Sequence, residues 1–186
     1  MSDRVELSAK QIRGLASVPR LSIVASLRAN GPQSIGELAE DLATEPKGLY
    51  YHVRALEALN LVLPHSTRST KRRQETVYAC SGPAFNVDLS GTDPVRNEAV
   101  RALARTIIRQ NAKLLDRAIG QLQPSAPERK GLNLQTINMR LSPKDLAEFE
   151  ERIIKLQDWA AARTTPEGMR VMVTLFSQPM QSGSDE

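Results

Sequence analysis

The sequence predicts a mainly helical α+β fold, and three observations support this class. Aromatic residues make up only 4% of the 186 residues while 40% are hydrophobic, so the core must consist largely of Leu, Ile, Val and Ala. These residues suit helices better than a large β-sandwich. Several stretches carry the 3, 4 and 7 spacing of amphipathic helices, and two short stretches bounded by turn residues add a small β component.

The composition also limits the classes of protein to be considered. A net charge of +4 and a pI near 9.5 permit nucleic-acid binding without requiring it. The single cysteine, Cys80, excludes an intrachain disulfide framework and a thiolate cluster for zinc. A charged amino-terminal stretch and no long apolar run predict a cytoplasmic protein without a membrane span. Because the sequence has no Gly-rich phosphate loop, His-x-x-x-His pair or nucleophile elbow, we expect no enzyme activity.

The first three helices are predicted from apolar spacing and end signals. The first two are expected over Leu7–Ser17 and Pro19–Ala29, since proline suits a first turn and Asn-Gly-Pro follows as a stop signal. The third is expected to begin at Ser34, where the sequence SIGE forms a capping box with Glu37. It should run through LAEDLA to a turn at Thr44-Glu45.

The fourth helix is predicted to begin at Pro46 and to have one buried and one exposed face. The expected buried residues are Leu49, His52, Val53, Leu56 and Leu59. The expected exposed residues are Lys47, Tyr50, Tyr51 and Arg54. We expect His52 to be a hydrogen-bonded core residue rather than a metal ligand. Asn60 can adopt the left-handed conformation that ends a helix.

A basic β-hairpin is predicted after this helix. LVLPHST (61–67) and ETVYACS (75–81) have strand character, and the intervening tip is rich in Lys and Arg. We expect Cys80 to fill the core as a small apolar residue and His65 to be an exposed strand residue.

Two short helices joined by a tight turn and followed by a basic hairpin form a layout suited to reading duplex DNA. A helix fits the major groove, and an arginine-rich hairpin reaches the flanking backbone or the minor groove. The predicted DNA-binding residues are Ser34, Lys47, Gly48, Tyr50, Tyr51, Arg54, Arg68, Lys71, Arg72 and Arg73. Gly48 would let the backbone approach closely, and the hairpin would supply attraction independent of sequence. Alternatively, such a domain can serve as a protein-interaction or RNA-binding module whose exposed tyrosines dock a partner.

Residues 7 to 80 resemble the ArsR-like winged helix-turn-helix transcription regulators of prokaryotes. The resemblance rests on RLSIVASL after Pro19, on SIGELAEDLA, on EPKGLYYHVRALEALNLV and on the hairpin ending in VYACS. It implies that the helix with His52 and Leu56 is the recognition helix. It also implies a homodimeric repressor bound to a palindromic double-stranded DNA operator, often released by a small-molecule effector. The effector and its binding residues remain unknown from the sequence.

The sequence departs from this family's pattern at the turn and at both metal sites. Ala43 and Glu45 stand where the family usually has a small turn residue and a serine cap. Ala39 and Asp41 replace the two cysteines of metal-sensing members, and residues 94–122 contain no histidine for the other common metal site. We therefore expect no bound metal and no cofactor.

One long helix is predicted over residues 94–122, with Asp93 as cap and Pro94 in the first turn. Its apolar face comprises Val100, Ala104, Ile107, Leu114, Leu115, Ala118 and Leu122. The resemblance implies that it pairs with the same helix of a second subunit. Opposite lies a stripe of cations at intervals of four, Arg101, Arg105, Arg109, Lys113 and Arg117. This stripe is either a solvated helix face or is matched by Asp145, Glu148, Glu151 or Asp158, by DNA flanks or by an anionic effector.

The remaining residues predict a small strand-helix-strand unit. Strands are expected over 132–141 and 169–177, around a helix that opens at Ser142-Pro143. One apolar face of this helix would cover a small sheet, and it comprises Leu146, Phe149, Ile153, Leu156 and Ala160. Trp159 would cap the core of this unit or line a pocket. The expected organisation is a winged helix-turn-helix domain over 1–85, a linker and dimerisation helix over 86–125, and an α/β dimerisation or effector domain over 130–180.

Overall fold

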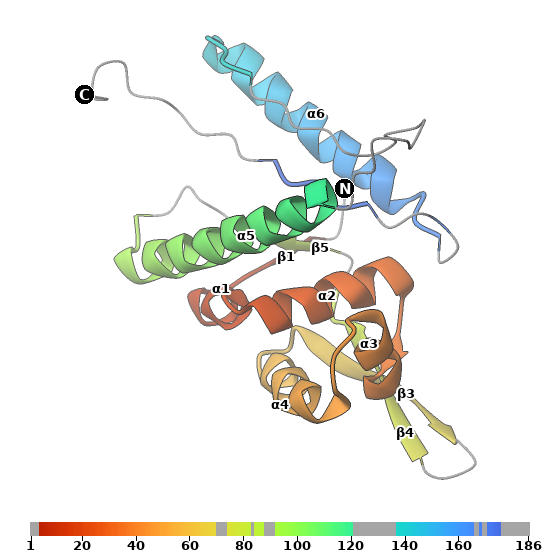
Figure 1. Ribbon diagram of the computed structural model, residues 1–186. Helices are drawn as coiled ribbons and strands as arrows, with labels where there is room; N and C mark the ends of the chain where they lie inside the picture. The colour runs from red at the N-terminus through yellow and green to blue at the C-terminus, as the bar shows by residue number, and fades with distance from the viewer. Residues whose placement is uncertain are drawn as a thin grey trace, which may run out of the picture.

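The computed structural model describes residues 4–69, 74–82, 84–87, 92–120, 137–165, 168 and 171–175, and it has an α+β winged-helix fold (Figure 1). The elements are β1 (Arg4–Glu6), α1 (Ala9–Leu15), α2 (Val18–Asn30), β2 (Gln33–Ser34), α3 (Ile35–Asp41), α4 (Pro46–Glu57), β3 (Val62–Ser69), β4 (Gln74–Cys80), β5 (Ala84–Asn86), α5 (Pro94–Gly120) and α6 (Pro143–Ala161). The predicted fold class is thereby confirmed.

One hydrophobic core joins α1 to α4, the hairpin and the first half of α5. Fully or almost fully buried residues are Leu7, Ile12, Ile23, Leu38, Val53, Leu56, Leu61 and Val62. Ala99 and Leu103 add α5 to the same core. In Figure 1, α2 lies between α5 on one side and α3, α4 and the hairpin on the other. The single core is consistent with the aliphatic composition, because leucine, isoleucine and valine form its centre.

Two capping boxes determine where α1 and α3 begin. The Ser8 side chain accepts a hydrogen bond from the Gln11 amide while the Gln11 side chain accepts one from the Ser8 amide, and Ser34 and Glu37 form the same pair. The box at Ser34 confirms the prediction. The box at Ser8 moves the start of the first helix from Leu7 to Ala9, and Leu7 is instead a buried residue ahead of the cap.

The hairpin forms with β2 a three-stranded antiparallel sheet of order β2-β4-β3. Ser34 pairs with Val77 in β4, so the residue that caps α3 also ends a strand. The register of β3 shifts between Pro64 and Ser66, which leaves His65 as the extra residue of a bulge. The predicted strands are confirmed, with β3 extended to Ser69.

A second, two-stranded parallel sheet joins β1 to β5, and the sequence did not predict it. Val5 pairs with Phe85, within a stretch that had only turn signals. Arg28 of α2 stacks on the Phe85 ring, with its guanidinium carbon 4.3 Å from the ring centre. The predicted turn at 81–94 is therefore corrected at Ala84–Asn86, because pairing with the distant amino terminus stabilises an extended conformation there.

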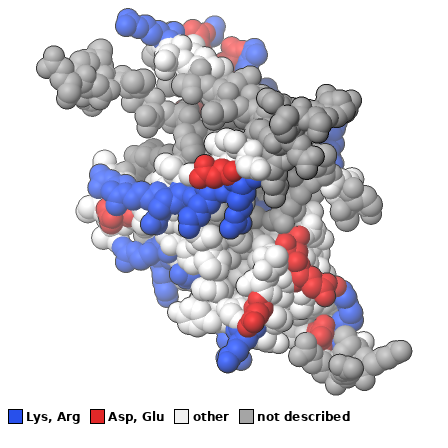
Figure 2. Space-filling view, in the orientation of Figure 1, with Lys and Arg blue, Asp and Glu red and all other residues white. Residues whose placement is uncertain are grey.

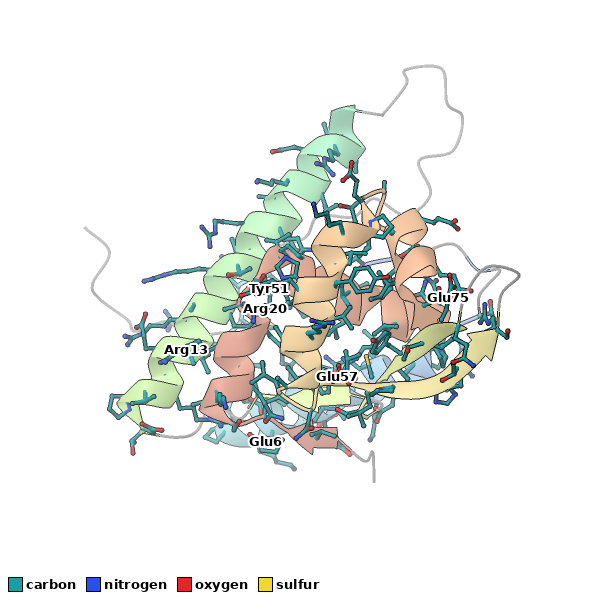
Figure 3. All side chains as sticks on the ribbon, turned by 90° about the horizontal axis from the view of Figure 1, so that it is seen from below. Glu6, Arg13, Arg20, Tyr51, Glu57 and Glu75 are labelled. Atoms are coloured by element: carbon teal, nitrogen blue, oxygen red, sulfur yellow. The ribbon has the colours of Figure 1, made fainter. Side chains whose placement is uncertain are left out.

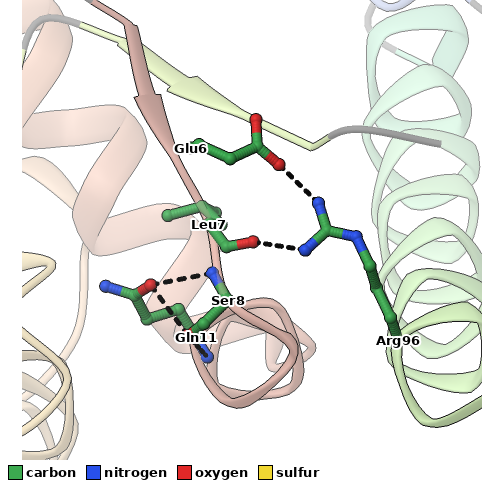
Figure 4. Close-up of polar contacts among 5 residues, drawn as sticks. All are labelled: Glu6, Leu7, Ser8, Gln11 and Arg96. Carbon is green, nitrogen blue, oxygen red and sulfur yellow. Dashed lines mark hydrogen bonds and ion pairs between the residues drawn. The ribbon is translucent and has the colours of Figure 1, made fainter. Parts of the chain in front are cut away.

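Arg96 fastens the start of α5 to the amino-terminal segment (Figure 4). Its guanidinium donates one hydrogen bond of 2.7 Å to the Leu7 carbonyl and another to the Glu6 carboxylate. The Arg96 side chain is only 17% exposed, so this contact is better protected from solvent than an ordinary surface ion pair. Together with the packing of α1 on α5, it fixes α5 to the core.

Two non-glycine residues adopt a left-handed backbone conformation. Asn60 (φ 53°) follows α4, as predicted from its residue type, and Ala43 (φ 47°) lies in the turn between α3 and α4. Alanine has no side-chain hydrogen bond to offset the steric cost of this conformation. Ala43, one of the two positions where this turn departs from the family pattern, is therefore conformationally strained.

Replacing Ala43 by glycine should stabilise the protein. Glycine removes about 1–2 kcal/mol of strain from the left-handed conformation, which is more than the cost of the higher backbone entropy that glycine gives the unfolded chain. We therefore expect the free energy of unfolding to rise by about 0.5–1 kcal/mol. The control is Ala55→Gly within α4, which should lower it by about 1 kcal/mol. Urea titration measures both changes, and a loss of stability in Ala43→Gly would contradict this account.

The carboxyl-terminal part differs from the predicted strand-helix-strand unit. Residues 137–141 and 171–175 form no strand, and the rest of both predicted strands lies outside the described residues. The helix α6 begins as predicted, with the Ser142 side chain accepting from the Asp145 amide, but none of its residues is buried. Leu146, Leu156 and Trp159 are 40–56% exposed. The predicted apolar face exists in sequence, but no described strand packs on it, and Trp159 stacks only on Arg163.

Candidate nucleic-acid interface

The helix α4 separates a buried face from an exposed face, as predicted. Leu49, Val53 and Leu56 are at most 4% exposed. Lys47, Gly48, Tyr50, Tyr51 and Arg54 are all exposed, and Tyr51 is 72% exposed. Two large aromatic side chains in solvent, with two cations on the same short helix, form a surface able to contact base edges and phosphates.

The start of α4 is set by Pro46 rather than by a side-chain cap. Proline occupies the first turn, where its missing amide hydrogen costs no helical hydrogen bond. Glu45 takes the cap position, but its side chain bonds to no helix amide. The first turn of α4, which carries Lys47 and Gly48, therefore presents free backbone amides beside the exposed face.

His52 lies at the edge of the exposed face and not fully within the core. It is half-buried, and its ring meets Tyr51 edge to face with 5.3 Å between ring centres. Its buried Nδ1 has no hydrogen-bond partner among the described residues, so the prediction of a hydrogen-bonded histidine is wrong at this atom. Burial lowers the pKa of His52, and the nearby Arg20 charge lowers it further. The ring is therefore neutral near pH 7.

Ser34 is a capping residue and does not belong to the exposed surface. It is 3% exposed, and its hydroxyl accepts a hydrogen bond from the Glu37 amide. Its backbone also pairs in β2. The structure therefore does not place the Ser34 side chain on the surface formed by the other predicted DNA-binding residues of α4, because cap formation and burial occupy its hydroxyl.

Arg68, near the hairpin tip, is held by Glu37 of α3. The Arg68 guanidinium donates a 2.7 Å hydrogen bond to one Glu37 carboxylate oxygen, while the other oxygen accepts from the Ser34 amide at 2.7 Å. The Ser34 amide, and then Arg68, lower the pKa of the Glu37 carboxyl. Arg68 is therefore partly neutralised and orients the hairpin relative to α3. The other predicted tip residues, Lys71, Arg72 and Arg73, lie outside the described residues.

Glu37 should make stability depend on pH in the acid range. Because its folded pKa lies below the unfolded value, it stabilises the fold above the unfolded pKa, and this contribution disappears as pH falls through the folded pKa. We expect Glu37→Gln to lower the melting temperature at pH 7 and to flatten the loss of stability below about pH 4.5. Arg68→Gln should retain most of the acid dependence, since the Ser34 amide is the larger cause. Thermal melts across pH test this, and an unchanged profile in Glu37→Gln would refute it.

The basic stripe on α5 is exposed over its whole length. Arg101, Arg105, Arg109, Lys113 and Arg117 form a ridge of positive charge, seen along the front of the molecule in Figure 2. Within the described residues, Arg101 lies 3.6 Å from Glu98 and Arg109 donates to the Arg105 carbonyl, but no ion pair joins the stripe to α6. Of the four acidic residues proposed to match it, Glu148 pairs with Arg152 and Glu151 with Lys155, both within α6.

The apolar face predicted for α5 divides between the core and the surface. Val100 and Ile107 pack against the core of the same chain. Farther along, Leu114 of the predicted face is 38% exposed, and Ile108 and Ile119, which were not part of that face, are 52% and 50% exposed. Leu122 lies outside the described residues. The second half of α5 therefore presents apolar side chains to solvent.

Two arginines that the sequence did not indicate lie on the side of the domain that carries α4. In Figure 3, which views this side, Arg13 of α1 and Arg20 of α2 lie on one side of α4 and the hairpin lies on the other. Neither arginine belongs to the predicted recognition helix or hairpin, and the sequence indicated neither as a DNA contact, although Arg20 opens the RLSIVASL stretch. Only the packing of α1 and α2 against α4 brings them there.

The described residues contain no group of three or more His, Cys, Asp or Glu side chains placed to hold a metal ion. Cys80 is partly buried, burial raises the pKa of its thiol, and its sulfur lies 3.8 Å from the Val24 carbonyl oxygen. None of the described helices is both long and apolar enough to cross a bilayer.

Comparison with known proteins places a recognised domain over this region. A family model described as a helix-turn-helix domain matches residues 15–65, from the end of α1 into β3. This match supports a DNA-binding transcription regulator. Among solved structures, the chain is similar to the crystal structure of RV1404 from Mycobacterium tuberculosis, with 20% sequence identity, 77% of this chain and 82% of that chain covered, and a TM-score of 0.32. No curated protein sequence matches.

Proposed function

We propose that this chain is a sequence-specific double-stranded DNA-binding transcription regulator of ArsR-like type, which acts as a homodimeric repressor without a thiolate metal site. The observation that carries this proposal is the exposed face of α4, which presents Tyr50, Tyr51, Lys47 and Arg54 to solvent next to a basic hairpin. In the major groove, α4 would place Arg54 and the tyrosines at base edges, and Gly48 would let the backbone approach a phosphate.

A homodimer would be joined through the second half of α5. Exposed apolar residues on a long helix favour pairing, since burial of Ile108, Leu114 and Ile119 against a second copy would remove them from water. A two-fold axis would place two α4 helices about one DNA turn apart, roughly 34 Å, on a palindromic operator. Residues 130–180 would enlarge this dimer or bind a small-molecule effector.

Binding to DNA selected from a random duplex pool tests the proposal. The full chain should bind the selected duplex in the nanomolar range in fluorescence anisotropy, and the affinity should fall steeply as salt rises. A scrambled duplex should bind far more weakly.

A protein-interaction or RNA-binding module is the second candidate, because the 72% exposed Tyr51 could equally anchor a partner. Weak binding that does not depend on salt, with no sequence enriched from the pool, would favour this second candidate and reject the first.

A further inference from the structure

Arg20 has an unusual environment for a cation. It lies in the first turn of α2 and is half-buried. Its Nε is shielded from solvent and has no hydrogen-bond partner among the described residues. Buried polar atoms are nearly always bonded, so this donor, which no described residue binds, is suited to a ligand.

The surroundings of Arg20 favour an anion. The first turn of α2 contains no acidic residue, and the Ser17 side chain makes no capping hydrogen bond to this turn. A cation in a first turn is opposed by the helix dipole, whereas an anion there is favoured. Burial, and then the Arg20 charge, lower the pKa of His52, so this neighbour is a neutral ring that adds no second positive charge beside Arg20.

The position of Arg20 relative to α4 points to the anion's source. Arg20 is close enough to His52 to act on it electrostatically, and the His52 ring meets Tyr51, the most exposed aromatic residue of α4. Figure 3 shows Arg20 next to Tyr51, with Arg13 farther along the same side and the hairpin across α4. Cations therefore flank the exposed face of α4 on the side away from the hairpin.

We propose that Arg20, assisted by Arg13, binds the phosphodiester backbone of duplex DNA on the side of α4 opposite to the hairpin. This inference rests on the proposed function, because it assigns a backbone contact to the same DNA. An arginine fork suits a phosphate, and contacts on both sides of a recognition helix fix its register in the groove without reading sequence. The hairpin supplies one side of this clamp, and α1 and α2 supply the other.

The experiment compares the salt dependence of binding in single variants of the full chain. Each phosphate contact contributes about 0.9 to the slope of log affinity against log salt. For Arg20→Gln we expect a slope shallower by about one for each bound subunit and an equal loss of affinity for selected and scrambled duplexes. Arg20→Lys keeps the charge and should retain the slope. Arg13→Gln should act in the same direction as Arg20→Gln.

The matched control is Arg109→Gln, which removes one charge from the α5 stripe. In Figure 1, α2 separates α5 from α4 and the hairpin. It should leave the slope unchanged. An unchanged slope in Arg20→Gln, or an equal change in Arg109→Gln, would overturn the inference while leaving the proposed function intact. Failure of the unmodified chain to bind any duplex would instead reject the proposed function. If melts show that Arg20→Gln is unfolded, Arg20→Lys and Arg13→Gln decide the outcome.

Discussion

Replacing Leu56 by alanine is expected to lower the free energy of unfolding by about 2–5 kcal/mol. Leu56 is completely buried at the centre of the core, where α4 packs against α2 and α3. The loss combines the transfer free energy of the removed methyl groups with the cavity left between helices that cannot close around it. Because a small domain is stable by only about 5–15 kcal/mol, urea titration should show a large shift of the midpoint.

The control for this change is Leu156→Ala, the same substitution on α6. Leu156 is 52% exposed, so its removal should alter stability by no more than about 0.5 kcal/mol. Equal losses in the two variants would mean that α6 is buried in solution and that the exposed position described for it is incorrect.

Replacing Arg54 by alanine should reduce discrimination between the selected and the scrambled duplex by about 1–3 kcal/mol, the contribution of one bidentate base contact. Arg54 is exposed on α4, and the proposed function places its guanidinium in the major groove. The melting temperature should hardly change, since the side chain fills no part of the core. Competition binding at fixed salt measures the discrimination directly.

Arg72→Ala provides the comparison, because the basic hairpin tip is expected to attract any duplex. It should weaken both duplexes alike and make the salt slope shallower by about one for each bound subunit. If Arg54→Ala and Arg72→Ala reduce binding to selected and scrambled DNA in the same proportion, α4 is not the element that reads sequence.

The faces of α4 could be predicted from the sequence because they depend on local periodicity. Leu49, Val53 and Leu56 recur at helical spacing, which forces Tyr50, Tyr51 and Arg54 to the opposite side. The start of α3 could also be predicted from the sequence, since Ser34 and Glu37 of its capping box are only three residues apart. That proximity predicted the cap, but it did not reveal that the cap would bury Ser34 and remove its hydroxyl from the surface.

Features that depend on distant pairing could not be predicted in the same way. The strand at Arg4–Glu6 is three residues long and forms only by pairing with Ala84–Asn86, and neither stretch has a strand pattern of its own. Arg20 was not among the residues predicted to bind DNA, and it reaches the α4 side only through helix packing. In the carboxyl-terminal part, alternation near Ile137 predicted a strand, yet alternation alone supplies no partner for the backbone.

The attachment of α5 by Arg96 has a mechanical consequence for operator choice. Arg96 bonds to the segment leading into α1, and Gln11 of α1 donates a 3.0 Å hydrogen bond to the Leu59 carbonyl just beyond α4. The helix that would join two subunits is thus connected through α1 to the end of the helix that would read DNA. In such a dimer, a change in the angle between the two α5 helices would move both α4 helices. The geometry of the subunit contact would therefore set the spacing of the DNA half-sites that the protein can bind.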